Sequence, residues 1–401
     1  MRRRPKDRKE QIARASADAF GEQGYHAVSM EDIAARVGIT PGALYRHSPS
    51  KYDLFRDAVL GLGQTLVDCT AFVDEPGADD DPAATLAALT AAIVDTTLAN
   101  RTAGGLYRWE ARYLQGADRG TLAEQVTLVH HRLDRPLSRL RPRLGHRQRL
   151  ALTTAALSVI GSITDHSNPL ATGEIRSGMA RLVADIMAAD LPTARRRAPE
   201  GPAPAVGAAA GMYEHVLYES VRLFYENGYR NTSMEDIASA VGIQPSGLYR
   251  SFPGKADILA LAYRRAADRH SGEVADIISR TDDPEAALVA LIDAHLSGMV
   301  RNPGLAYVYY TERHNVPQAD LRVLDTIEHS AMEAWSRLVT AVRPEVKIGW
   351  ARYAVGAAFA LTVDFGRLFD SLHGIESTAW IRRLMHITLL GSPTPLAISA
   401  R

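Results

Sequence analysis

Apolar side chains recur every three to four residues along most of the chain, which is the spacing of one face of an α-helix. The first such segment spans residues 8–23 and places Ile12, Ala15, Ala19 and Phe20 on one face. No segment alternates apolar and polar residues over the length of a strand, so we expect no strands. The pattern therefore predicts an all-α protein.

Proline, glycine and acidic residues divide this pattern into separate helices. In the first half we expect, after 8–23 and two short helices, further helices near residues 51–73, 82–100, 103–115, 119–140, 146–166 and 174–190. In the second half we expect helices near residues 212–227, 234–241, 245–251, 255–280, 284–301, 304–314, 318–342, 345–371 and 376–390. The segment 191–211 is rich in proline, alanine and arginine and is predicted to be a linker.

One stretch of the chain occurs twice. Residues 29–51 align without a gap to residues 233–255, and most aligned positions are identical. The repeat distance is about half the chain, so it indicates two fused copies of one domain and not a solenoid of short repeats.

The repeated stretch has the signals of two short helices joined by a tight turn. Ser29 and Asp32 form a capping box at the start of the first helix, and Gly38 suits its end because glycine tolerates left-handed backbone torsions. Thr40 can cap the second helix, with Pro41 at its first position. The second copy repeats this order, and the two-helix corner predicts a DNA-binding helix-turn-helix.

In this interpretation the second helix enters a major groove. Its small first residues let the backbone approach DNA closely, and its tyrosine and arginine reach phosphates or bases. The predicted DNA contacts are Ser29, Thr40, Pro41, Gly42, Ala43, Tyr45, Arg46, His47, Lys51, Ser233, Gln244, Pro245, Ser246, Gly247, Tyr249, Arg250 and Lys255. The alternative is an ordinary two-helix corner, which the occurrence of two matching copies disfavours.

The combination of an N-terminal helix ending in Gly-Tyr, then Ser-Met-x-x-Ile-Ala-x-x-Val-Gly-Ile, then Pro-x-x-Leu-Tyr-Arg-x-x-Pro-x-Lys, resembles the DNA-binding domain of TetR/AcrR-type regulators. The resemblance covers residues 8–60 and 212–265, and only length and pattern extend it over the rest. The basic opening and the tandem layout are similar to those of double TetR-type repressors of mycobacterial mammalian-cell-entry operons.

The resemblance implies a tandem arrangement with a helix-turn-helix domain and a helical effector-binding and pairing domain in each half. The expected domains are 1–60, 61–190, the linker 191–211, 212–265 and 266–395. Fusing two copies offers an intramolecular pseudo-dimer through the small-residue helices 150–165 and 350–369, and further oligomerisation stays open. The alternative is that each half pairs with another chain.

The two heads differ in sequence. Gln244 suits an adenine edge and Thr40 a thymine methyl, so we expect an imperfect or non-palindromic double-stranded DNA operator. Ser48 stands where the family usually has an aromatic residue, while Phe252 keeps it, so we expect looser packing in the first head.

The chain has 46 lysines and arginines in total and 46 aspartates and glutamates in total, so it is not a strongly basic protein that covers nucleic acid by charge alone. Residues 2–9 are nevertheless strongly basic, and Arg3, Arg4 and Lys6 are predicted to contact DNA, unless this arm is only a solvated tail. The single cysteine fits a reducing cytoplasm. We expect no signal peptide and no apolar run long enough to cross a membrane.

The resemblance also implies a small effector in the helical bundle of each half, which releases DNA. Candidate contacts are Tyr107, Trp109, Arg112, Tyr113, Tyr307, Tyr310, Arg313 and His314, with Glu110 and Glu312 beside them. An aromatic set beside an arginine suits an extended apolar molecule with an anionic end, and the resemblance suggests a lipid- or sterol-derived effector, including a CoA thioester. The alternative is that the aromatics are core and that Arg112 and Glu110 form a surface pair.

Catalytic patterns are not found in the sequence. The histidines lack metal spacing, and no nucleotide loop or nucleophile elbow is visible, so we expect no enzyme activity, metal or cofactor. The competing class is a regulator-like fold used for protein interaction or activation, in which one or both heads do not bind DNA.

Overall fold

The computed structural model describes residues 5–77, 80–165, 169–192, 211–368 and 375–391, which fall into two compact units, Met1–Ala188 and Ala189–Arg401. Within the described residues every regular element is helical, as the periodicity predicted. The arginines Arg3 and Arg4 and linker residues 193–210 lie outside the described residues.

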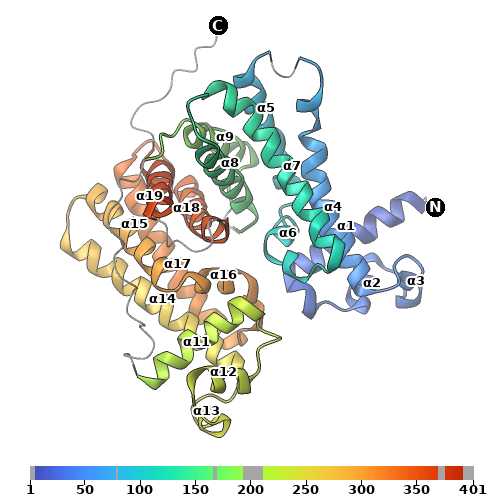
Figure 1. Ribbon diagram of the computed structural model, residues 1–401, viewed down its shortest axis with the longest axis vertical. Helices are drawn as coiled ribbons and strands as arrows, with labels where there is room; N and C mark the ends of the chain where they lie inside the picture. Colours follow the sequence, from blue (N-terminus) through green and yellow to red (C-terminus); the bar gives the residue numbers. More distant parts are fainter. Residues whose placement is uncertain (1–4, 78–79, 166–168, 193–210, 369–374, 392–401) are drawn as a thin grey trace. The chain divides into compact units, whose positions relative to one another are not determined.

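Unit 1 begins with three helices that form a small head (Figure 1). They are α1 (Pro5–Ala27), α2 (Met30–Val37) and α3 (Pro41–Tyr45). The bundle of unit 1 consists of α4 (Lys51–Cys69), η1 (Ala71–Asp74), α5 (Pro82–Ala99), α6 (Leu106–Trp109), η2 (Ala111–Tyr113), α7 (Gly116–Leu140), α8 (His146–Gly161), η3 (Ser162–Asp165) and α9 (Thr172–Met187). Helix α4 contacts both α1 and α7 and so connects the head to the bundle.

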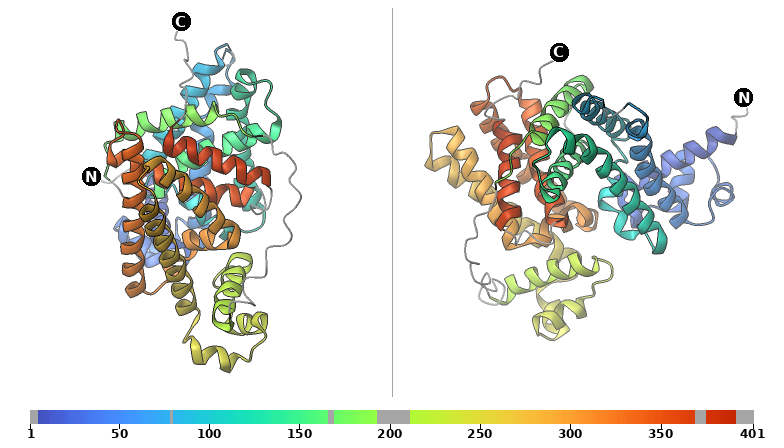
Figure 2. Two further views of the ribbon diagram at one scale, coloured as in Figure 1. Left: turned by 90° about the vertical axis from the view of Figure 1, so that its left-hand side faces the viewer. Right: turned by 45° about the horizontal axis from the view of Figure 1, so that its top comes forward.

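Unit 2 repeats this order, with α11 (Met212–Asn227), α12 (Met234–Val241) and α13 (Pro245–Ser251) forming its head at one end of the unit (Figures 1 and 2). Its bundle consists of α14 (Lys255–Arg280), α15 (Pro284–Arg301), α16 (Pro303–Glu312), η4 (Arg313–Asn315), α17 (Gln318–Val342), α18 (Ile348–Leu368) and α19 (Ile375–Leu390). Helix α14 contacts α11, α15 and α17, as α4 contacts its counterparts.

Several expected boundaries are wrong. The first helix begins at Pro5, so part of the predicted basic arm is helical, and it continues past Gly24, where non-helical torsions (φ 78°, ψ 158°) kink it. The predicted helices 103–115 and 304–314 are each split into an α-helix and a following 3₁₀ turn. In the first head α3 ends at Tyr45, and His47 donates its N–H to the carbonyl of Leu44 in a tightened last turn.

Two further expectations need correction. Leu191, expected to open the linker, is buried, and the Trp380 indole N–H donates to the Pro192 carbonyl at 2.9 Å. Helix α5, with a mean hydropathy of 1.4 over 18 residues, is long and apolar enough to cross a membrane. It packs against α7 and α9, and a single helix of this kind is weak evidence for a span because bundle helices pass the same test.

Candidate DNA interface and its junction with the bundle

The capping boxes that the sequence predicted begin α2 and α12, the first helix of each helix-turn-helix. The Ser29 hydroxyl accepts the Asp32 N–H at 3.1 Å, and the Asp32 carboxylate accepts the Ser29 N–H at 2.8 Å. Ser233 and Asp236 form the same capping box, and in both copies the serine hydrogen bonds hold the aspartate pKa below its usual value. Ser29 and Ser233 are therefore committed to folding the heads as well as being predicted DNA contacts.

The tight turns between the two helices also repeat. Gly38 and Gly242 end α2 and α12 with φ of 68° and 78°, a region that residues with a Cβ rarely adopt. Thr40 then caps α3, because its hydroxyl accepts the Ala43 N–H at 3.2 Å. Gln244 occupies the same position before α13 but makes no cap hydrogen bond with its side chain, so its amide is available to a partner.

Each recognition helix is held by one buried leucine and presents polar and aromatic groups outward. Leu44 and Leu248 are almost fully buried, whereas the tyrosines that follow them, Tyr45 and Tyr249, are 50% and 48% exposed. The exposed predicted contacts in this region are Thr40, Gly42, Arg46, His47, Gln244, Ser246 and Arg250, and the partly exposed ones are Pro41, Ala43, Pro245 and Gly247. A Cβ added at Gly42 or Gly247 would meet no protein atom within 4 Å, so the fold itself does not require small residues there.

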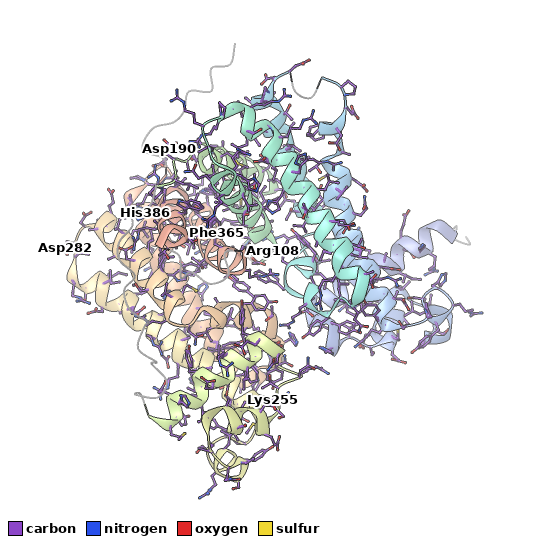
Figure 3. All side chains as sticks on the ribbon, viewed as in Figure 1. Arg108, Asp190, Lys255, Asp282, Phe365 and His386 are labelled. Carbon is purple, nitrogen blue, oxygen red and sulfur yellow. The ribbon has the colours of Figure 1, made fainter. Side chains whose placement is uncertain are left out.

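The predicted phosphate contacts Lys51 and Lys255 are placed differently from what the sequence suggested. Figure 3 labels Lys255 in the lower part of unit 2. Its ammonium group donates to the carbonyls of Tyr229, Arg230 and Thr232 at 2.7 to 3.3 Å and lies 4.5 Å from the Tyr229 ring centroid. Burial lowers the Lys255 pKa.

Lys51 does the same in the first head, where it donates to the carbonyls of Val28 and His26 over the Tyr25 ring. Both lysines thus tie the first helix of the bundle to the turn after the first helix of the head. Their contact with DNA stays a prediction.

A buried glutamate completes this junction in each unit. Tyr25, which follows the kink at Gly24, donates its N–H to the Glu110 carboxylate at 2.9 Å. Tyr229, which follows Gly228 (φ 83°), donates its N–H to Glu312 at 3.2 Å, and Asn315 donates to the other Glu312 oxygen at 2.8 Å. We call each set of glutamate, tyrosine N–H and lysine the latch of its unit.

The predicted effector contacts lie along this junction. The Tyr113 ring contacts the rings of Tyr25 and His26, and the Arg112 guanidinium donates to the Tyr113 hydroxyl at 2.9 Å. Arg112 and Glu110 do pair, at 3.9 Å, but their side chains are only 17% and 8% exposed, so the pair is largely buried and not on the surface as the alternative had it.

Sequence reasoning missed Arg108, although it neighbours a chosen residue. Its guanidinium pairs with the Asp165 carboxylate at 3.0 Å, the Trp109 N–H donates to the same carboxylate at 3.1 Å, and all three side chains are largely buried (Figure 3). Nothing in the linear pattern indicates that Asp165, more than fifty residues away, would join them.

In unit 2 the corresponding segment divides between junction and bundle. Tyr307 contacts Tyr225 of the head edge to face at 5.5 Å, and the Tyr310 ring contacts Tyr309. Arg313 lies over the Tyr309 ring and pairs with Asp325 and Glu328.

Burial raises the Glu328 pKa to about 7. His314 lies 3.3 Å from the Asn315 amide. The cleft described in unit 2, between α14 and α15, contains none of these residues.

The heads differ in packing where the sequence suggested. Phe252 is buried and stacks on Tyr213 at 5.0 Å, whereas Ser48 is buried with its hydroxyl donating to the Ser50 carbonyl at 3.4 Å. Arg8, part of the predicted basic arm, donates to the carbonyl of Val37 at the end of α2 at 3.2 Å. The side chain of Lys6 lies outside the described residues.

Comparison with known proteins shows which family of domains these heads resemble. The profile of the family described as "Bacterial regulatory proteins, tetR family" matches residues 12–58 and again 216–262. The chain is 26% identical over 181 residues to the HTH-type transcriptional repressor KstR2 of Rhodococcus jostii, covering 45% of this chain and 82% of that protein. It is 41% identical over 54 residues to the HTH-type transcriptional activator FasR of Mycolicibacterium smegmatis, covering 13% and 25%.

Among solved structures, the ketosteroid transcriptional regulator KstR2 of Mycobacterium tuberculosis aligns with a TM-score of 0.40 at 17% identity, covering 48% of this chain and 98% of that one. FadR from Bacillus subtilis in complex with stearoyl-CoA aligns with a TM-score of 0.38 at 18% identity, covering 45% and 99%. Two family matches, one in each unit, and the repeated helix-turn-helix together show that this chain carries the DNA-binding domain of the tetR family of bacterial regulatory proteins twice.

Proposed function

We propose that this protein is a transcriptional repressor whose single chain binds one operator through two non-identical heads. The observation that carries the proposal is the exposed tyrosine and arginine in each head, Tyr45 and Arg46 at the end of α3 and Tyr249 and Arg250 on α13, where a buried leucine fixes each helix. Such groups on a short helix after a tight turn suit a major groove and its flanking phosphates.

The two heads support an asymmetric operator. The Thr40 hydroxyl accepts the Ala43 N–H in the cap of α3, whereas the exposed Gln244 amide is available for an adenine edge. A homodimer presents two equal heads and reads a palindrome, but this chain presents two different ones. We therefore propose an imperfect or non-palindromic site with half-sites about one helical turn apart.

Pairing of the two halves within one chain is part of the proposal and rests on the sequence. Both copies carry a helix rich in alanine and other small residues, α8 and α18, and small residues let helices approach closely. Repression, as opposed to activation, is supported by the relative named as a repressor, which matches over most of its length. The relative named as an activator matches over only 54 residues.

Release by a small apolar or lipid-derived effector completes the proposal. The segments predicted to contact it also hold the latch glutamates Glu110 and Glu312. A ligand that moves α6 or α16 would therefore act directly on the turn that carries each head. The chain then needs no separate element to transmit the effect of binding.

The test is selection of bound duplexes from a random pool, followed by stoichiometry on the selected site. We expect one chain per asymmetric site, and we expect Tyr45→Ala and Tyr249→Ala each to weaken binding about tenfold or more, since each removes contacts to a charged backbone. Two chains on a palindrome would contradict pairing within the chain. No enrichment, or no effect of either substitution, would favour the interaction-protein alternative.

A further inference from the structure

The turn between α11 and α12 presents an arginine that the sequence did not single out as a DNA contact. Arg230 is exposed, whereas Tyr229 before it and Thr232 after it are buried. Ser233, a predicted DNA contact, caps α12 three residues later. The carbonyls of this turn accept from the ammonium group of Lys255 at the start of α14. Arg230 therefore lies beside the starts of two helices that carry predicted DNA contacts.

The Arg230 guanidinium has no partner among the described residues. The one hydrogen bond that involves this residue uses its backbone carbonyl, which accepts from Lys255 at 3.3 Å. The guanidinium therefore has all its N–H donors available to another molecule.

A second positive charge lies close to Arg230. Burial lowers the pKa of Lys255, and the charge of Arg230 lowers it further. All three N–H groups of the Lys255 ammonium donate to carbonyls, so this lysine contributes charge but no free donor. Glu312 offsets part of the charge, but its oxygens already accept from Tyr229 and Asn315. An anion at this turn would relieve the repulsion between two cations and would take its hydrogen bonds from Arg230.

The second head has few cations with which to hold DNA. Residues 212–254 contain three arginines and no lysine, against five acidic residues. One of the three, Arg222, pairs with acidic side chains on either side of it in α11 at 2.7 and 2.6 Å. Arg230 and Arg250 are therefore the arginines of this head that no described carboxylate neutralises.

The first head has no cation at the corresponding turn. The gapless alignment of the two heads places His26 at the position of Arg230. His26 is half-buried, and its ring packs against Tyr25 at 5.0 Å and Tyr113 at 4.5 Å between centroids. This side chain is therefore part of the junction between head and bundle, and it does not present a charge to solvent as Arg230 does.

The first head has its extra cations at a different place. Arg8 and Lys9 lie in the first turns of α1, and the same alignment gives Met212 and Tyr213 at the start of α11. Tyr213 stacks on Phe252 at 5.0 Å and so belongs to the packing of the second head. The positive charge that one head has at the start of its first helix, the other has at the end of it.

We propose that Arg230 is a DNA-backbone contact of the second head alone, and that its guanidinium binds one phosphate flanking the half-site read by α13. A planar guanidinium can donate two parallel hydrogen bonds to one phosphate, which suits an exposed arginine better than the enclosed ammonium of Lys255. Such a contact adds affinity and carries no base information. It rests on the proposed function, because it requires that the second head binds DNA.

The first experiment measures affinity of the full chain for the selected duplex over a range of salt concentrations. Arg230→Ala should weaken binding about tenfold at low salt and reduce the slope of log affinity against log salt by about 0.9, without changing sequence preference. Arg230→Gln, which keeps a polar side chain at this exposed position, should act like alanine, and Arg230→Lys should keep most of the slope. Arg337→Ala, which removes an exposed arginine near the end of α17, is the control and should leave the slope unchanged.

The second experiment locates the phosphate with duplexes that carry one neutral methylphosphonate at a time. The half-site of the second head is the one whose protection Tyr249→Ala weakens. We expect a methylphosphonate beside it that weakens the wild type about tenfold and leaves Arg230→Ala unaffected.

An unchanged slope for both Arg230→Ala and Arg230→Gln, an equal reduction for Arg337→Ala, or a sensitive phosphate beside the other half-site would each overturn this contact while the proposed function stands. No DNA binding by the wild type would refute the proposed function and the contact together.

Discussion

The two units agree where the head joins the bundle and differ at the centre of the bundle. Each latch uses a buried glutamate, the N–H of a tyrosine after a left-handed glycine, and a lysine over that tyrosine ring. The bundle centres, by contrast, have Leu66, Ile93, Leu133 and Leu157 in unit 1. At the corresponding positions unit 2 has four ring side chains in contact, which we call the ring layer: His270, His295, Trp335 and Phe359. In a fused repeat, the part that orients the DNA-binding helices is kept twice, while the bundle interior is free to specialise in one copy.

The largest effect should follow from breaking a latch. Glu312→Ala removes the acceptor of the buried Tyr229 N–H and of the Asn315 amide, so we expect a loss of about 3 kcal/mol in the stability of unit 2. Urea unfolding of the full chain, followed by the fluorescence of the tryptophans, measures this change.

Glu312→Gln keeps a carbonyl acceptor and serves as the matched control, with a clearly smaller loss expected. Glu110→Ala should weaken unit 1 by a similar mechanism, since Glu110 accepts the Tyr25 N–H. If either alanine variant unfolds like the wild type, the glutamate does not stabilise that junction, and the two units do not share the latch.

The next largest effect should be a difference between the two units in how much stability they lose in acid. His295 is neutral in the folded chain with a pKa of about 3, whereas an unfolded histidine titrates near 6.5. The unfolded state therefore binds more protons below pH 6.5, and stability falls as the pH falls. At pH 5 we expect unit 2 to lose about 2 kcal/mol from this residue, with a further loss from His270.

The double substitution His270→Leu and His295→Ile installs the residues of unit 1 and should flatten this dependence. Unit 1 also contains a partly buried histidine, His130, whose pKa burial lowers, so a smaller acid effect is expected there. Equal acid sensitivity of the wild type and the double variant would show that the ring layer is not what distinguishes the units in acid.

The sequence predicted the helices well because local signals and burial point to the same boundaries. Pro284 after an aspartate begins α15, the capping boxes begin α2 and α12, and Gly38 and Gly242 end them, as expected. The segments 103–115 and 304–314 were predicted less well. There the chain turns after Trp109 and after Glu312 so that the latch glutamate can reach the head, a tertiary requirement that periodicity does not contain.

The site was only partly predictable for the same reason. The exposed recognition residues follow from local caps and from one buried leucine per helix, so Tyr45 and Tyr249 could be chosen from the sequence. Lys51 and Lys255 looked like phosphate contacts because the sequence does not show that backbone carbonyls surround them. The ring layer joins residues up to 89 positions apart, His270 to Phe359, and only the fold brings them together.

A smaller effect is expected from making the two heads alike. Gln244→Thr gives α13 the capping residue that α3 has in Thr40, and a threonine there can only improve the cap. If Gln244 reads a base, the variant should shift preference toward a more symmetric operator by about 1 to 2 kcal/mol. Competition between the selected site and its symmetrised version measures this, and an unchanged preference would place the asymmetry elsewhere in the heads.

The smallest effect concerns salt. Arg46 and Arg250 are exposed beside the recognition tyrosines, so each is expected to neutralise about one phosphate. Replacing either by alanine should reduce the slope of log affinity against log salt by about 0.9, with little change in sequence preference. Arg36→Ala is the control, because its guanidinium already pairs with Glu22 at 2.7 Å within the first head. A reduced slope for Arg46→Ala but not for Arg250→Ala would mean that the first head supplies more of the phosphate contact, so the two heads would differ in affinity as well as in the bases they read.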